Sequence, residues 1–200
     1  MKTLLTFFVL LLSSSVFAED ISDFEIGGIS AGDSLLDLIS EEEINKEIKR
    51  NRNDYAHLGD EFGEVYFDGN SPNYDYLSFF VKTPYITKDN EYFIYLIRGI
   101  KQYEGNNIDQ CYKKMNIIEE GMNNEILSNA ERFENSFNHR IDPSGKSLVK
   151  EITYIFDSGD RILFNCIDFE ENLRIQNNWT EGLSVSIVTS EIYEWFYPNK

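Results

Sequence analysis

The spacing of apolar residues changes along the chain, and the first clear pattern predicts two short helices in succession. The apolar side chains within residues 35–39 are spaced as on one face of a helix. Asp33 or Ser34 would cap that helix by accepting a hydrogen bond from its first turn. Ser40 and Glu43 then form a capping box, with apolar residues four apart behind it. We therefore expect the domain to open with a helix pair.

Two runs rich in aromatic and β-branched residues follow, at residues 74–82 and 91–103. A proline and a Lys-Asp-Asn run between them are typical of a connecting loop, so the two runs are predicted to pair as antiparallel strands. The preceding segment, residues 51–73, is polar and interrupted by glycines. It is predicted to be a loop that holds one strand, at residues 64–67.

The longest helix is predicted to begin at Asn106 or Asn107. C-terminal to that position, apolar residues recur at spacings of three and four, which is the pattern of a helix that packs one face on a core. The stripe consists of Ile108, Cys111, Tyr112, Met115, Ile118 or Glu119, Met122 and Ile126. Because Cys111 lies on this stripe, its side chain is expected to face the sheet.

Strand patterns dominate the second half of the chain. Residues 148–156 and 161–168 flank a four-residue Asp-Ser-Gly-Asp turn and predict a β-hairpin. Within residues 183–187, apolar side chains alternate with serines, as in a half-buried strand. Ser190 is expected to cap a last helix.

The polar segments at residues 129–146 and 170–182 are predicted to be loops. The predicted element order is therefore αα-ββ-α-βββ-α. Hairpins dominate this order and strand–helix–strand crossovers do not repeat, which favours the α+β class. We expect a single domain over residues 19–200, with a largely antiparallel sheet and helices on one face.

The N-terminus has the pattern of an export signal. Lys2 provides the positive end, residues 4–12 are an apolar run, and the small residues around Ala18 suit cleavage after that position. The apolar run is shorter than the roughly 20 residues that a membrane span needs. The mature chain is therefore predicted to be a soluble periplasmic or secreted protein without a transmembrane segment. The alternative is an uncleaved N-terminal anchor.

Charge argues against one class of partner. The chain has 18 basic and 35 acidic residues, a net charge of −17. A chain this acidic repels nucleic acid and anionic lipid surfaces, so no nucleic acid is expected as a partner. The acidic residues are spread along the sequence rather than run together, which is typical of a solubilising surface.

The two cysteines, Cys111 and Cys166, are an even pair. In an oxidising exported compartment such a pair predicts one disulfide. The disulfide would stabilise the fold by about 4 kcal/mol through the chain entropy of the unfolded state. The alternative is a pair of buried free thiols. Neither cysteine has a CxxC partner, so redox catalysis is not indicated.

The string Gly-Asp-Ser-Leu at residues 32–35 resembles the first block of the GDSL, or SGNH, hydrolases. The resemblance implies that Ser34 is a nucleophile and that a histidine late in the chain takes its proton. The two histidines, His57 and His139, both lie before the last sixty residues. Asp54 and His57 spell D-x-x-H, but they follow Ser34 too closely to match the family's late block. Ser34 and His57 are the candidates of a hydrolase hypothesis, and a helix cap at Ser34 is the preferred interpretation.

No metal or cofactor site is predicted. The two histidines stand alone in the sequence, which does not suit zinc. Asp157, Asp160 and Asp168 could line a cation site, but the EF-hand spacing is absent. The turn of the predicted hairpin explains these aspartates better.

Aromatic residues provide the remaining clue. Large rings lie on both faces of the strands predicted at residues 74–82 and 91–103. One face must belong to the core. The other is either covered by helices or is a binding surface for a protein or a ligand.

Five strings, at residues 23–26, 32–37, 40–44, 111–115 and 156–160, resemble a group of small exported bacterial proteins of unassigned function. This resemblance implies a location and no catalytic residue. The leading hypothesis is a non-enzymatic exported protein that binds another macromolecule or a ligand through its sheet or loops. The alternative is an SGNH-like esterase that uses Ser34 as its nucleophile.

Overall fold

The computed structural model describes residues 21–68, 73–84, 91–103, 107–122 and 127–198. The predicted signal segment, residues 1–18, lies outside the described residues. No helix within the described ranges is long and apolar enough to cross a membrane.

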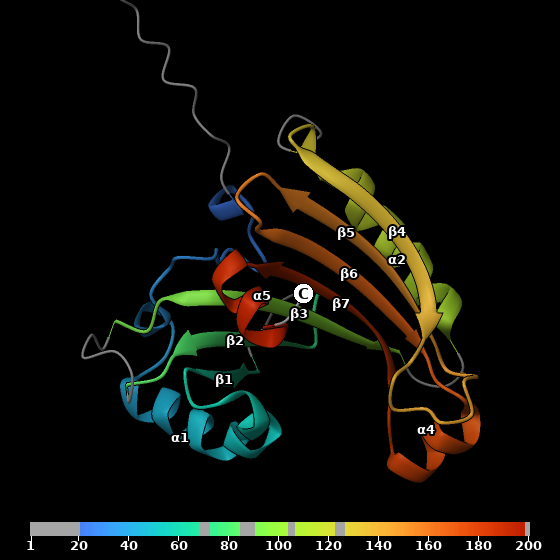
Figure 1. Cartoon of the computed structure of the whole chain (residues 1–200), viewed down its shortest axis with the longest axis horizontal. Coiled ribbons are helices and arrows are strands. Elements are labelled where there is room, and N and C mark those ends of the chain that lie inside the picture. The colour runs from blue at the N-terminus through green and yellow to red at the C-terminus, as the bar shows by residue number, and fades with distance from the viewer. Residues whose placement is uncertain (1–20, 69–72, 85–90, 104–106, 123–126, 199–200) are drawn as a thin grey trace, which may run out of the picture.

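Seven strands form one sheet in which every neighbouring pair is antiparallel. The strand order across the sheet is β1-β2-β3-β7-β6-β5-β4, and the sheet twists strongly from β1 to β4 (Figure 1). The strands are β1 (Phe62–Phe67), β2 (Tyr76–Lys82), β3 (Ile94–Tyr103), β4 (Ala130–Asn138), β5 (Leu148–Phe156), β6 (Arg161–Asp168) and β7 (Glu181–Val188).

The described helices are α1 (Glu41–Asn51), α2 (Ile108–Gly121), α4 (Glu171–Asn177) and α5 (Ser190–Phe196), with short 3₁₀ turns before and after α1. The predicted capping box is present, because the Ser40 hydroxyl accepts from the Glu43 N–H and the Glu43 carboxylate accepts from the Ser40 N–H. This pair satisfies backbone donors that the first turn of α1 leaves free.

One face of the sheet, the α2 face, carries the main core. Helix α2 packs across β6 and β7 there, and α1 packs against β1 at the other end of the sheet. Cys111 of α2 and Cys166 of β6 form a disulfide with a Cα–Cα distance of 5.9 Å, which confirms the predicted pairing. Both cysteines are fully buried beside Met115.

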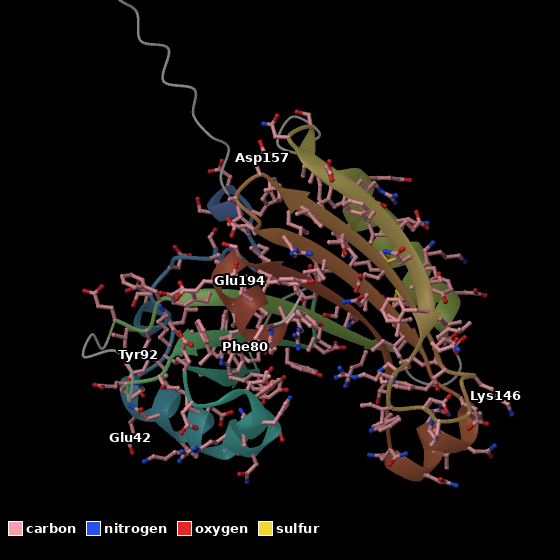
Figure 2. The ribbon with its side chains drawn as sticks, viewed as in Figure 1. Glu42, Phe80, Tyr92, Lys146, Asp157 and Glu194 are labelled. Carbon is pink, nitrogen blue, oxygen red and sulfur yellow. A yellow bond between two sulfur atoms is a disulfide. The ribbon has the colours of Figure 1, made fainter. Side chains whose placement is uncertain are left out.

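The opposite face, the α5 face, has a smaller core of its own. Ile192 of α5 packs there with Phe80, Leu96 and Val188 (Figures 1 and 2). These residues alternate along their strands with those of the α2 face, as the period of two in a strand requires. Helices α1 and α2 thus share a face as predicted, whereas α5 covers the opposite one.

The α+β class, the largely antiparallel sheet and the hairpin of β5 and β6 are confirmed. Two predicted loops contain further elements. Residues 129–146 include β4, and residues 170–182 include α4. Strand β4 is exposed along almost its whole length. Its two phenylalanines are four positions apart with polar residues between them, so it has no apolar alternation to mark it as a strand.

The helix predicted at residues 35–39 is only a 3₁₀ turn, Leu35–Asp37. Backbone groups at residues 32–35 bond to the start of β3 instead, and the Gly32 N–H donates to Ile94 O at 2.8 Å. The Leu38 N–H donates to Leu35 O, which is the i to i+3 bond of a 3₁₀ turn. Ser40 then begins α1 as its N-cap, so the helical segment before it is a single turn.

Candidate functional site

Ser34 lies beside the first residues of β3 and is partly buried. Its hydroxyl donates to Glu91 O at 2.7 Å, and its side chain caps no helix. The predicted capping role is therefore wrong. The Ser34 hydroxyl instead ties the 32–35 segment to the chain that leads into β3.

His57 is exposed in the 3₁₀ turn Ala56–Leu58. No hydrogen bond joins it to Ser34, although both residues are within the described part of the chain. His139 lies elsewhere, at the end of β4, with its ring against Phe169 at 5.2 Å between centroids. Burial lowers the pKa of His139.

The three aspartates considered for a cation are separated. Asp160 accepts from the Ser190 N–H at 2.6 Å and from the Ser158 hydroxyl at 2.8 Å, so it joins the β5–β6 turn to the start of α5. Asp157 lies at the tip of this turn (Figure 2), whereas Asp168 is at the other end of β6. Among the described residues, no group of three His, Cys, Asp or Glu side chains is placed to hold a metal ion.

The α5 face contains a different concentration of polar side chains. Because the strand registers align, its side chains form transverse rows that cross the sheet from β1 to β4. The α5 row contains Glu64, Phe80, Leu96, Val188, Arg161, Ile155 and Glu131. The central row contains Tyr66, Ser78, Arg98, Ser186, Leu163, Thr153 and Phe133. The outer row contains Tyr76, Ile100, Ser184, Asn165, Glu151 and Asn135.

Glu64 is a buried carboxylate at the β1 end of the α5 row. Its side chain is only 1% exposed. One carboxylate oxygen, Oε1, accepts from the Ser78 hydroxyl and lies 4.0 Å from the Arg98 guanidinium. The other, Oε2, is buried and has no hydrogen-bond partner among the described residues. A buried charged group with an unused oxygen is costly to a fold.

Arg98 lies in the middle of the central row, on β3, with its side chain 28% exposed. Ser78 and Ser186 are its direct neighbours across the sheet, on β2 and β7. A guanidinium has five N–H donors in a fixed planar arrangement. Its only ion pair in the described structure is the long one to Glu64, so Arg98 keeps donors that a ligand can use.

Three tyrosines surround this charge pair. Burial, together with the negative charge of Glu64, raises the pKa of Tyr55 to about 12. Burial also raises the pKa of Tyr66 and of Tyr76, whose ring centroids lie 5.9 Å apart. All three phenols are therefore protonated near neutral pH. The Tyr55 ring packs against Phe80, Trp195 and Phe196 in the core beneath α5. Tyr66 and Tyr76 are partly exposed, so they can offer a hydroxyl group and a flat ring to a ligand.

The rows continue across the other half of the sheet, over β7, β6, β5 and β4. The Ser184 and Ser186 hydroxyls lie 3.5 Å apart, and Asn165 has a buried amide oxygen for which no described residue is a hydrogen-bond partner. At the β4 edge, Phe133 and Phe137 are 43% and 46% exposed. Aromatic side chains thus lie at both ends, with hydroxyl, amide and charged groups between them.

This arrangement combines donors, acceptors and flat rings on a rigid sheet, which is how proteins orient ligands.

Sequence patterns did not identify these side chains. Glu64 and Arg98 lie 34 positions apart, and only the register of three strands brings them together. One signal was present in the sequence. Arg98 interrupts a run of apolar residues in a predicted strand, and a charge in such a place needs a partner or a function.

Comparison with known protein families, with characterised proteins and with solved structures gave no match. A function for this chain must therefore be inferred from the chemistry of its own side chains.

Proposed function

We propose that this chain is an exported, non-enzymatic protein that binds a ligand on the α5 face of its sheet. The observation that carries the proposal is the pair formed by Glu64 and Arg98. Glu64 is buried, and one of its oxygens has no hydrogen-bond partner in the described part of the chain. Arg98 is partly buried, and the one ion pair it makes there is long, at 4.0 Å. Selection for stability alone favours apolar side chains in such a place, so we assign the pair to binding.

Export is supported by two features. The N-terminal residues have the pattern of a cleavable signal, and Cys111 is joined to Cys166. Structural disulfides form and persist in oxidising compartments such as the periplasm or the extracellular space. We propose one of these as the location of the mature chain.

Matched capture experiments test the binding proposal. Mature protein, its Arg98→Ala variant and its Lys146→Ala variant are immobilised and exposed to periplasmic and secreted fractions of the source cells. Lys146 is a suitable control, because it is exposed, carries the same charge and lies near α4, far from β2 (Figure 2). Mass spectrometry then identifies bound proteins, glycans and small molecules.

We expect one ligand to be retained by the parent and by Lys146→Ala but lost from Arg98→Ala. Identical eluates from all three proteins would overturn the proposal.

A second assay addresses the hydrolase alternative. The Ser34 hydroxyl is bonded to a backbone carbonyl and has no histidine partner, so we expect no turnover of short-chain aryl esters. Ester turnover by the parent that is lost in Ser34→Ala would show that the chain is an enzyme, and the non-enzymatic proposal would fail.

A further inference from the structure

Resting on the proposed function, we propose that the ligand of the α5 face is a neutral, polyhydroxylated chain, that is, an oligosaccharide. It would lie along the central and outer rows, across the strands. The charges, the hydrogen-bonding groups and the aromatic rings of these rows each support this choice.

The charges disfavour ligands that carry a net charge. Arg98 occupies the middle of the central row, so a polycation that crossed it would meet a like charge. A polyanion would meet Glu64, Glu151 and a chain whose net charge is −17. Glu64 and Arg98 offset each other, so the centre of the surface is nearly neutral and suits a neutral ligand.

The hydrogen-bonding groups demand a ligand that both donates and accepts. Arg98 is donor only, whereas Glu151 is an acceptor when ionised. Ser184 and Asn165 have side chains that can do both. A sugar hydroxyl also donates and accepts, so adjacent hydroxyls can satisfy neighbouring side chains of opposite character.

The aromatic side chains suit the flat faces of sugar rings. Tyr66 and Tyr76 lie at the β1–β2 end, and Phe133 and Phe137 lie at the β4 edge. The C–H face of a pyranose packs against an aromatic ring through dispersion and the negative face of the π-system.

The length of the rows indicates an oligomer rather than a single sugar. Six inter-strand intervals separate β1 from β4. Neighbouring strands lie roughly 4.8 Å apart, so the rows extend for about 29 Å along the sheet. A ligand that reaches both aromatic ends must therefore contain several units.

Glu64 has a positioning role in this arrangement. Its side chain is almost wholly buried, so direct contacts fall to Arg98, Ser184, Asn165, Tyr66 and Tyr76. Glu64 holds the guanidinium on the surface by its charge, at 4.0 Å.

Calorimetric titration with a fixed panel tests the proposal. The probes are cellohexaose, maltohexaose, mannohexaose and N-acetylchitohexaose, with hexalysine and hexaglutamate as charged comparisons. We expect at least one hexasaccharide to bind with a Kd below about 1 mM, and neither peptide to bind. Loss of one charge-assisted hydrogen bond weakens binding by about tenfold or more, which we expect for Arg98→Ala. The same loss is expected for Tyr76→Ala, while Lys146→Ala retains the parent's affinity.

Several results would overturn the proposal: no hexasaccharide binds, a peptide binds instead, or a hexasaccharide binds equally well to parent, Arg98→Ala and Tyr76→Ala. If Arg98→Ala does not fold, Ser184→Ala and Asn165→Ala replace it, since each removes a polar side chain assigned to the ligand at a partly exposed position. Unchanged affinity in both replacements would also overturn the proposal.

The capture experiment separates this inference from the proposed function. A captured ligand that is not a glycan and depends on Arg98 would overturn only the oligosaccharide assignment. Capture of nothing that depends on Arg98 would overturn both.

Discussion

The two faces of the sheet are built from alternate residues of the same strands, yet they differ in chemistry. Along β6, Ile162, Phe164 and Cys166 point to the α2 face and are almost fully buried. Their neighbours Leu163 and Asn165 point to the α5 face and are partly exposed. One side of β6 thus belongs to the apolar core, and the other side forms a partly exposed surface of apolar and polar side chains.

This difference shows where stability and function separate. The α2 face has a helix, a disulfide and a continuous apolar core. The α5 face has a small apolar core beneath α5, and its central and outer rows mix apolar and aromatic residues with serines, an amide and charged side chains. Substitutions on the α2 face should therefore reduce stability, whereas substitutions in the central and outer rows of the α5 face should reduce binding.

The largest contrast is expected within β6. Phe164→Ala should reduce the free energy of unfolding by about 3–5 kcal/mol, because it leaves a cavity in a fully buried position. Leu163→Ala should cost about 1–2 kcal/mol, because part of its side chain is already in water. Urea unfolding of the two variants measures both. Equal losses would show that the α5 face is as much a core as the α2 face.

The disulfide on the α2 face should contribute about as much to the free energy of unfolding as the Phe164 side chain does. Its two cysteines are 55 positions apart, and on the chain-entropy model such a crosslink contributes about 4 kcal/mol. We expect Cys111→Ser with Cys166→Ser to lower the urea midpoint accordingly. Labelling of the denatured, unreduced parent should detect no free thiol, and two labelled cysteines would contradict the structure.

A smaller, pH-dependent effect is expected at the edge of the α2 face. The Glu119 carboxylate accepts from the Tyr154 hydroxyl at 2.6 Å and from Arg132 Nε at 2.7 Å. Burial alone would raise the pKa of Glu119, but the bonds from Arg132 and Tyr154 outweigh it and hold the pKa below its ordinary value. A carboxyl with a lowered pKa stabilises the fold above its unfolded pKa, and this contribution is lost as the pH falls through the folded pKa.

Glu119→Gln should therefore cost about 1–3 kcal/mol at pH 7. It should also lose less stability than the parent between pH 5 and pH 3. The exposed neighbour Glu120 provides a matched control, and Glu120→Gln should change stability by no more than about 0.5 kcal/mol. Parallel pH profiles for the parent and Glu119→Gln would exclude the proposed role of this carboxylate.

The smallest effect is expected at Ser34. Ser34→Ala removes the hydrogen bond to Glu91 O and should cost about 1 kcal/mol, the usual net value of one hydrogen bond. Thermal unfolding measures this loss. Ligand binding on the α5 face should be unchanged, and a variant that folds normally but no longer binds would move the site to the 32–35 segment.

The sequence predicted elements whose signals are local. The β5–β6 hairpin was predictable from a Gly-containing turn between two apolar runs, and the start of α1 from a capping box. Strand β4 was not, because its nine residues are mostly polar and its two phenylalanines, four positions apart, make no apolar alternation. Its strand structure is imposed by pairing with β5, and long-range pairing has no signature within the segment itself.

The candidate site was less predictable than the fold. The disulfide could be inferred from two cysteines and an export signal. Glu64, Arg98 and Ser184, in contrast, come from three strands spread over 121 positions, and they share a face only after β7 inserts next to β3. The Gly-Asp-Ser-Leu string was locally conspicuous, but its serine bonds to a backbone carbonyl.

The most direct test of the functional difference between the two faces is an NMR titration of the ¹⁵N-labelled mature chain with the tightest-binding hexasaccharide. We expect the largest amide shifts at Arg98, Ser184 and Asn165 and in the strands beside them, with α2 unchanged. Shifts confined to α2 or to the 32–38 segment, or no shifts at saturating sugar, would contradict binding on the α5 face.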